Sequence, residues 1–138
     1  MDSLRLFRSL PEVQPYKLGE FIFREGDPGT TMYMVIEGEI ELLVGAEVME
    51  QAGPGAFLGE MALIDDAPRS ASARAKSDCR VFPIDNSRFQ SLVKETPTFA
   101  LDVMTALALR LRKTNARINA RNAAPRKRVS ARAGARRR

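Results

Sequence analysis

The spacing of glycine restricts this chain more than any other feature, because it limits the regular elements of the first half to a few residues each. Eight of the nine glycines fall between positions 19 and 59. The runs between them are rich in β-branched, aromatic and methionine side chains: FIF (21–23), TMYMVIEG (31–38), EIELLV (39–44) and EVMEQ (47–51). Short strands with a turn signal about every 8 to 12 residues are typical of a β-sandwich or β-barrel. We therefore expect a mainly β domain.

The turns and the next two strands follow from the same reasoning. EGDPG (25–29) and GPG (53–55) combine proline with glycine and so mark turns. SASARA (70–75) and CRVFPI (79–84) are predicted to be two further strands, joined by a turn at Ser77 and Asp78. Pro83 has no backbone N–H and is expected at a sheet edge or a strand end.

After these strands the hydrophobic period becomes helical. Asp85 is a suitable N-cap for a helix that carries Phe89, Leu92 and Val93 on one face. A second helix is predicted to begin at Pro97, where a missing N–H has no cost, and to end near residue 118. Its apolar stripe consists of Phe99, Val103, Met104, Leu107 and Leu111.

Charge divides the chain into an acidic body and a basic end. Residues 1–102 hold 10 Lys/Arg and 17 Asp/Glu (10 − 17 = −7), whereas residues 103–138 hold 12 Lys/Arg and no acid (+12). Beyond residue 119 the sequence is mostly Ala and Arg, and Pro125 and Gly134 argue against a continuous helix. We predict one domain at 1–119 and a disordered basic tail at 120–138.

Composition excludes several classes of function. The chain has no histidine and one cysteine, Cys79, which removes the usual zinc sites, imidazole-dependent triads and disulfides within the chain. We expect no catalytic residues and no bound metal. Arg5 and Arg8 interrupt the first apolar segment, and no 18 apolar residues run together, so neither a signal peptide nor a membrane span is predicted. A cytoplasmic location is expected.

The segment GEMALIDDAPRSA (59–71) carries the chemistry of a binding site. Gly59 lacks a Cβ and allows close approach of a ligand, and EMAL can form one helical turn whose first amides favour an anion. Arg69 offers a planar fork of donors for phosphate oxygens, Ser70 adds a hydroxyl, and Glu60 suits a sugar hydroxyl. These residues predict a cradle for a sugar phosphate.

A second interpretation of this segment remains open at this point. The residues could form an ordinary solvated turn, in which Arg69 pairs with Asp65 or Asp66 at the surface. Spacing alone favours this simpler interpretation.

A family resemblance supports the sugar-phosphate interpretation. FLGEMALIDDAPRSASARA (57–75) closely resembles the phosphate-binding cassette of the cyclic-nucleotide-binding domain family, and GEFIFREGDPGTTMYMVIEGEIEL (19–42) is similar to the strands that precede it. The family includes catabolite activator proteins, kinase regulatory subunits and nucleotide-gated channels. The resemblance spans about residues 16–115. It implies an eight-stranded β-roll of the double-stranded β-helix or jelly-roll type, with a short phosphate-binding helix and two C-terminal helices.

The resemblance also implies roles for single residues. Glu60 would accept the ribose 2′-hydroxyl, Arg69 would bind the exocyclic oxygens of the cyclic phosphate, and the backbone of Ala62 would help to complete the cradle. Serine at position 70, where the family varies among Ala, Ser and Thr, favours cAMP over cGMP as the ligand, and no cofactor is expected. The implied ligand-binding residues are Gly59, Glu60, Met61, Ala62, Arg69 and Ser70.

The implied function is that of a receptor whose C-terminal helix moves over the purine as a lid. No DNA-binding or catalytic segment resembling those of the family follows residue 115, so a stand-alone receptor domain is expected. Met104, Leu107 and Leu111 could cap the base or form a homodimer, although core packing is the simpler role for this stripe.

Three alternatives belong to other functional classes. The basic tail could bind nucleic acid, an acidic protein or an anionic membrane surface, with the β-roll as a scaffold, although the tail has no aromatic side chains for base stacking. An enzyme of the cupin type would share the β-roll, but such sites rely mostly on histidine ligands. A β-roll that has lost its ligand and serves as a scaffold, or one that binds another nucleotide, is the last alternative, and the presence of both Glu60 and Arg69 argues against loss of the ligand.

Overall fold

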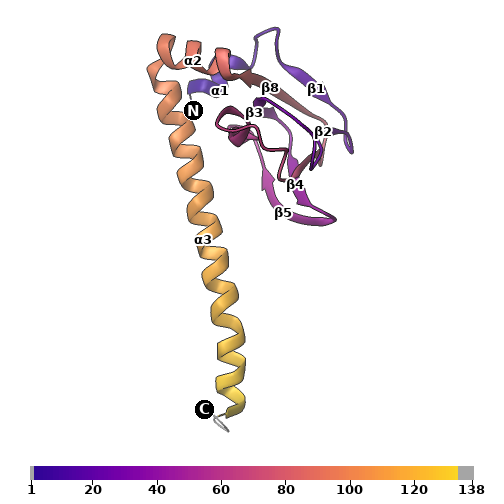
Figure 1. The fold of residues 1–138 in the computed structure, drawn as a ribbon, viewed down its shortest axis with the longest axis vertical. Coiled ribbons are helices and arrows are strands. Elements are labelled where there is room, and N and C mark those ends of the chain that lie inside the picture. The colour runs from indigo at the N-terminus through magenta and orange to yellow at the C-terminus, as the bar shows by residue number, and fades with distance from the viewer. Residues whose placement is uncertain (1, 134–138) are drawn as a thin grey trace. The chain divides into compact units, whose positions relative to one another are not determined.

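The computed structural model describes the backbone of residues 2–133 and the side chains of residues 3–122. The chain forms two units, 1–106 and 107–138, which are described separately. The first unit holds the strands, which are drawn as arrows in Figure 1. They are β1 (Gln14–Tyr16), β2 (Phe21–Phe23), β3 (Thr31–Glu37), β4 (Ile40–Val44), β5 (Glu47–Ala52), β6 (Phe57–Leu58), β7 (Ser72–Ala75) and β8 (Cys79–Asp85).

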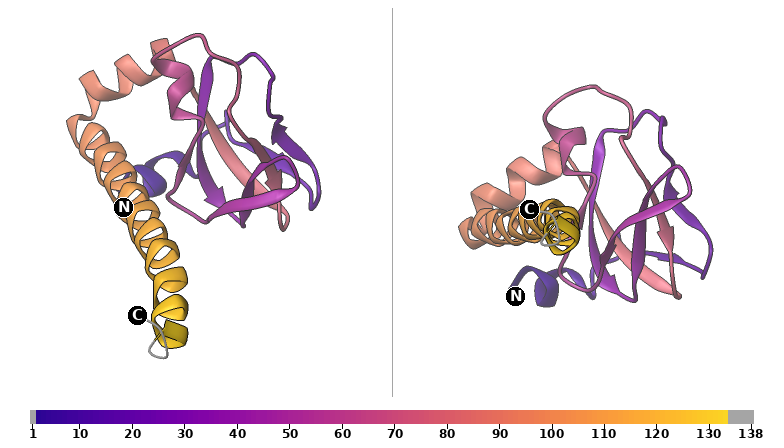
Figure 2. Two further views of the ribbon diagram at one scale, coloured as in Figure 1. Left: turned by 60° about the horizontal axis from the view of Figure 1, so that its bottom comes forward. Right: turned by 90° about the horizontal axis from the view of Figure 1, so that it is seen from below.

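The strands form two four-stranded antiparallel sheets, with the orders β1-β8-β3-β6 and β2-β7-β4-β5. Consecutive strands alternate between the two sheets, except that β4 and β5 are neighbours in the same sheet. Figure 2 shows the strands as a roll with α1 (Asp2–Phe7) and α2 (Asn86–Glu95) on one side. The predicted eight-stranded jelly roll is confirmed. One cluster of its core consists of the buried side chains Ile22, Val35, Ile40, Ala52, Leu58, Ala73, Ala75, Cys79 and Val81.

Six of the strands lie where the sequence predicts them, and β1 and β6 were not predicted. Pro83 lies inside β8, opposite Tyr33 of β3. On the other side of β8, β1 pairs only with residues 79–81. At Pro83 the strand therefore has a paired neighbour on one side only, which fits the expected position at an edge.

A cluster of phenylalanine rings attaches the helices to the roll. Phe7 of α1 stacks on Phe82 of β8, with ring centroids 4.4 Å apart. Phe99, near the start of α3 (Pro97–Ala133), makes edge contacts with Phe7, Phe57 and Phe89 at 5.7, 6.1 and 5.6 Å. Such pairs add to the free energy gained by burying the rings. The start of α3 is therefore fixed to the roll from three elements.

Hydrogen bonds define the ends of the helices. The Asp85 side chain accepts a bond from the Arg88 N–H at 2.7 Å, which confirms Asp85 as the N-cap of α2. Pro97 is the first residue of α3, as predicted. Ser3 of α1 donates its backbone N–H and its hydroxyl to the Asp102 carboxylate at 3.2 and 2.6 Å, which ties α1 to the first turns of α3.

The extent of α3 corrects the prediction. The helix continues to Ala133 instead of ending near residue 118, so residues 120–133 are helical where a disordered tail was expected. Alanine and arginine are strong helix formers, and their abundance here outweighs the single proline at position 125. Residues 134–138 lie outside the described part. The chain divides into two compact units after Ala106, and the domain boundary expected at residue 119 stays a prediction.

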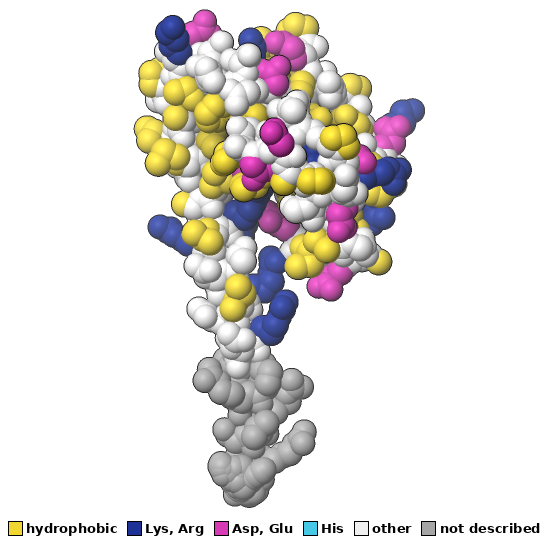
Figure 3. All heavy atoms as spheres, in the orientation of Figure 1, with side chains coloured by type: hydrophobic (Ala, Val, Ile, Leu, Met, Phe, Trp, Pro, Cys, Tyr) yellow, Lys and Arg dark blue, Asp and Glu magenta, His cyan; other side chains and the backbone are white. Residues whose placement is uncertain are grey.

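Only part of the apolar stripe of α3 is buried. Phe99 and Val103 belong to the core, whereas Met104 and Leu111 are 64% and 61% exposed. Exposed hydrophobic side chains along this helix are visible in Figure 3. Within residues 2–133, none of the helices is both long and apolar enough to cross a lipid bilayer.

Candidate functional site

The loop after β6 folds around Gly59, as the binding-site interpretation requires. Gly59 adopts φ +70°, a left-handed conformation that favours glycine, and it precedes the 3₁₀ helix η1 (Glu60–Leu63). A Cβ at Gly59 would lie 2.5 Å from Nη1 of Arg69. The predicted one-turn helix at EMAL is confirmed, and the glycine before it is required both by the turn and by the approach of Arg69.

Arg69 is the central side chain of this site. Its side chain is buried, with only 9% of the residue exposed. One guanidinium nitrogen, Nη2, donates to the Thr31 carbonyl at 2.7 Å, and Nη1 makes a longer bond of 3.4 Å to the Gly59 carbonyl. Cζ lies 4.3 Å from the centre of the Phe23 ring. The side chain is thus directed into the roll and held by three different elements.

No carboxylate neutralises this guanidinium among residues 3–122, where side chains are described. Within the same residues, Nε of Arg69 is buried without a hydrogen-bond partner. Arginine stays protonated in proteins, and a buried charge is costly unless an opposite charge compensates it. The solvated-turn alternative is wrong, because Arg69 is buried, and Asp65 accepts a bond from the Ala67 N–H at 3.0 Å instead of pairing with it.

The loop between β2 and β3 closes over Arg69. The Arg69 N–H donates to the Asp27 carbonyl, and the Arg69 carbonyl accepts from the Gly26 N–H, both at 2.8 Å. A Cβ at Gly29 in the same loop would overlap the guanidinium group. The sequence marked this EGDPG segment only as a turn, and the contribution of Gly29, Phe23 and Thr31 to the site was missed.

The other predicted site residues lie on the same loop with different exposure. Glu60 begins η1 and is half-buried, and Met61 beside it is 54% exposed. Ala62 is half-buried, and its N–H donates to the Gly59 carbonyl at 3.1 Å. Ser70 is exposed. The structure brings Gly59 and Arg69 into direct contact, and the ligand roles of all six residues stay predictions.

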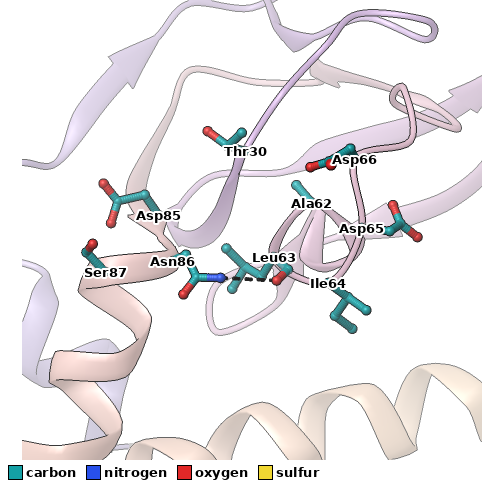
Figure 4. Close-up of a pocket in the computed structure, with 9 residues that line it drawn as sticks. All are labelled: Thr30, Ala62, Leu63, Ile64, Asp65, Asp66, Asp85, Asn86 and Ser87. Atoms are coloured by element: carbon teal, nitrogen blue, oxygen red, sulfur yellow. Dashed lines mark hydrogen bonds between the residues drawn. The ribbon is translucent and has the colours of Figure 1, made fainter.

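A polar pocket of about 440 Å³ lies beside η1. Figure 4 shows its lining residues, contributed by Thr30, by η1 and the loop after it, and by the start of α2. The residues are Thr30, Ala62, Leu63, Ile64, Asp65, Asp66, Asp85, Asn86 and Ser87. Three aspartates disfavour an anion here, and Arg69 is not part of the lining, so this pocket is unsuited to a phosphate.

One hydrogen bond crosses this pocket. The Asn86 side-chain amide donates to the Leu63 carbonyl at 3.2 Å, as the dashed line in Figure 4 marks. It connects η1 with the first residue of α2. The segment that carries Gly59 and the helix that precedes α3 are therefore in direct contact.

The described side chains do not form a metal centre. Within residues 3–122, no three Cys, Asp or Glu side chains are placed to bind a metal ion. Among residues 3–122, the Arg69 guanidinium is buried between Gly29 and Gly59 and forms no ion pair.

Comparison with known proteins identifies the family. The cyclic nucleotide-binding domain matches residues 13–96, which is more than half of the chain. The chain belongs to the cyclic nucleotide-binding domain family.

Named relatives come from several kinds of protein. The cAMP-dependent protein kinase regulatory subunit of Hypocrea atroviridis is 40% identical over 82 residues, covering 59% of this chain and 18% of that protein. The CRP-like cAMP-activated global transcriptional regulator of Mycobacterium tuberculosis is 29% identical over 111 residues, covering 75% and 50%. The chain therefore spans from about a fifth to half of the length of these two relatives.

A solved structure has a similar fold. It comes from work described as "A cyclic-GMP-dependent signalling pathway regulates bacterial phytopathogenesis" and has a TM-score of 0.68 and 32% sequence identity. The match covers 81% of this chain and 93% of that one. The eight strands and the helices around them are therefore those of the family.

Proposed function

We propose that this chain is a cyclic nucleotide receptor in which Arg69 binds the cyclic phosphate. The observation that carries the proposal is the buried guanidinium, whose Nε has no partner and which pairs with no acid among the residues described. The exocyclic oxygens of a cyclic phosphate would supply the missing negative charge. Glu60, one residue from Gly59 at the start of η1, would accept the ribose 2′-hydroxyl.

The nucleotide base is the finer part of this proposal. Serine at position 70 favours cAMP over cGMP, and the two named relatives above respond to cAMP by their names. The similar solved structure is instead described with a cyclic-GMP-dependent signalling pathway, which argues against a preference for cAMP. We propose cAMP as the preferred ligand. Met61 and Ala62 would line the site next to the phosphate.

A titration of the chain with cAMP, cGMP and 5′-AMP tests the proposal. A ligand that binds only the folded state raises its stability by about 2.7 kcal/mol at a hundred times Kd. We expect heat of binding and a raised Tm with cAMP, weaker effects with cGMP and none with 5′-AMP. Absence of heat and of a Tm change with both cyclic nucleotides would contradict the receptor function. Stronger binding of cGMP would contradict only the preference.

Movement of the C-terminal helix is the proposed output. The Asn86 bond to the Leu63 carbonyl supports a route from η1 to α2, and α2 leads directly into α3 at Pro97. Amide hydrogen exchange with and without cAMP tests this route. We expect changed protection in α2 and in the first turns of α3, and a smaller change in Asn86→Ala. Equal protection with and without a bound ligand would contradict the movement.

A homodimer through α3 is the proposed assembly. Met104, Leu111 and Ile118 recur every seven residues and are all exposed. This spacing is typical of one face of a two-stranded coiled coil. Sedimentation equilibrium of the chain is expected to give a dimer, and Leu111→Glu to give a monomer. A monomer at all concentrations of the unmodified chain would contradict this assembly.

The basic end supports a second candidate function. Twelve Lys/Arg and no acid follow residue 102, which favours binding to nucleic acid or to an acidic partner. A gel-shift series at two salt concentrations, with a chain ending at Asn115 as the control, tests this function. Loss of a salt-sensitive shift on shortening would support it, and an unchanged shift would exclude the removed residues.

A further inference from the structure

Phe23, the last residue of β2, contacts the guanidinium of Arg69. The Arg69 Cζ lies 4.3 Å from the ring centroid, within the range of a cation–π interaction. A Cβ at Gly59 would lie 3.3 Å from Phe23 Cε2 and 2.5 Å from Arg69 Nη1. The ring, the guanidinium and the Gly59 backbone are therefore closely packed together.

We propose that Phe23 is a positioning residue, whose ring stabilises the Arg69 cation and fixes its direction before any ligand binds. This inference rests on the proposed function of Arg69 as the phosphate-binding side chain. A carboxylate could hold the guanidinium equally well, but it would neutralise the charge and compete with the phosphate. The face of an aromatic ring attracts a cation without doing either.

The chain itself shows the other way to hold an arginine. Arg74 of β7 binds the Glu41 carboxylate at 2.8 Å, and its Cζ lies 5.9 Å from the Phe21 ring. There the acid satisfies the charge and the ring is a distant neighbour. At Arg69 the ring is close, and no acid pairs with it among residues 3–122.

The Phe23 ring is itself held from the opposite sheet. It stacks with Tyr33 of β3, with centroids 6.0 Å apart and an angle of 26° between the rings. Both rings are half-buried and pack against the core of the roll. Thr31, whose carbonyl accepts the 2.7 Å bond from Arg69, belongs to the same strand as Tyr33. One strand therefore fixes both the ring and the carbonyl that orient the guanidinium.

The first test measures the Arg69 side chain by NMR in the unmodified, ligand-free chain. A guanidinium over a ring face shows upfield ring-current shifts, so we expect upfield shifts of the Arg69 side-chain protons. Phe23→Leu keeps the apolar bulk but removes the ring, and the shifts should disappear. Unshifted Arg69 signals in the unmodified chain would overturn the proposal. This measurement needs no ligand, so it decides the role of Phe23 even if no cyclic nucleotide binds.

The second test measures the Kd for cAMP in three variants. Loss of a cation–π interaction predicts that Phe23→Leu raises Kd by about 3- to 30-fold. Phe23→Tyr keeps the ring and should bind like the unmodified chain. Phe21→Leu is the matched control, because the Phe21 ring lies against Arg24 and, more distantly, Arg74, whereas Arg69 lies over Phe23.

The outcomes separate the two hypotheses. An unmodified chain that binds neither cAMP nor cGMP contradicts the proposed function, and the NMR shifts then decide about Phe23. Binding by the unmodified chain with an unchanged Kd in Phe23→Leu overturns the positioning role alone. An equal rise of Kd in Phe21→Leu also overturns the positioning role, because the loss of affinity would then follow from removal of either ring in β2.

Discussion

Two arginines of neighbouring segments are held in opposite ways. Arg74 is 38% exposed at its side chain and is paired with Glu41, whereas Arg69 is buried and is bonded to two backbone carbonyls. An arginine that serves the fold obtains its counter-ion within the chain. Arg69 is buried without a counter-ion among residues 3–122, and under the proposed function the ligand supplies the opposite charge. Under the proposed function, the contrast separates a structural cation from a ligand-binding cation within five residues of sequence.

Replacing each arginine by alanine gives the largest expected difference. A charge-assisted hydrogen bond contributes about 1.5 to 3 kcal/mol, so the loss of one such bond in Arg69→Ala should raise the Kd for cAMP by about 10- to 150-fold. Arg74→Ala should leave Kd nearly unchanged. Isothermal titration calorimetry measures both, with circular dichroism as the control for folding. Equal affinities of Arg69→Ala and the unmodified chain would remove Arg69 from the site.

Glycine substitutions disturb Arg69 without changing its charge. In Gly29→Ala the new Cβ would overlap the guanidinium, which must move, and we expect Kd to rise by about tenfold, the effect of losing one hydrogen bond. Gly45→Ala is the control. Gly45 has φ +61° and open space around it, so alanine there costs stability, about 1 kcal/mol, but not affinity. If Gly29→Ala binds cAMP as tightly as the unmodified chain, the position of the guanidinium in this structure is not the binding position.

The Arg74–Glu41 pair should affect the fold only slightly and the ligand not at all. Because Arg74 is partly exposed, solvent screens the pair, and Glu41→Gln should lower the free energy of unfolding by no more than about 1 kcal/mol. Urea denaturation measures this loss, and calorimetry should give an unchanged Kd for cAMP. A weaker Kd in Glu41→Gln would contradict the separation of the two arginines.

Much of the roll could be predicted from local sequence, and the two missed strands show the limit. FIF, TMYMVIE and IELLV form strands that their β-branched and aromatic residues favour. QPY and FL contain one aromatic residue each and no β-branched residue, and they are strands because β8 and β3 pair with them. The end of α3 differs from the prediction for another reason, because the helix-forming residues around the proline at 125 outweigh its effect on the helix.

The site divides in the same way. Gly59 and Arg69 are ten residues apart in one motif, so the sequence could predict them together. Thr31 lies 38 residues from Arg69, and its contribution is a backbone carbonyl that any residue could supply. Phe23 and Gly29 belong to a strand and a turn whose own patterns explain them fully. Their second role arises only when the two sheets pack, so no local pattern could indicate it.

The smallest expected effect comes from the buried Cys79 thiol, which should change the stability of the fold but not the affinity for the ligand. Burial, with a smaller contribution from Asp78, raises the pKa of the Cys79 thiol above its ordinary value of 9.0. The thiol therefore stays neutral in the folded chain at a pH where it ionises in the unfolded chain, so the stabilisation is complete below about pH 9 and is lost as pH rises through the folded pKa. One group changes the free energy of unfolding by at most about 1.4 kcal/mol per pH unit.

Urea midpoints from pH 8 to 10 should fall less in Cys79→Ala than in the unmodified chain, while Kd for cAMP in the folded chain stays constant, because a guanidinium cannot lose its proton in this range. Equal falls of the midpoint in both chains would show that Cys79 does not respond to its burial, and a Kd that rises with the same pH profile would show that a titrating group, and not Arg69, holds the ligand.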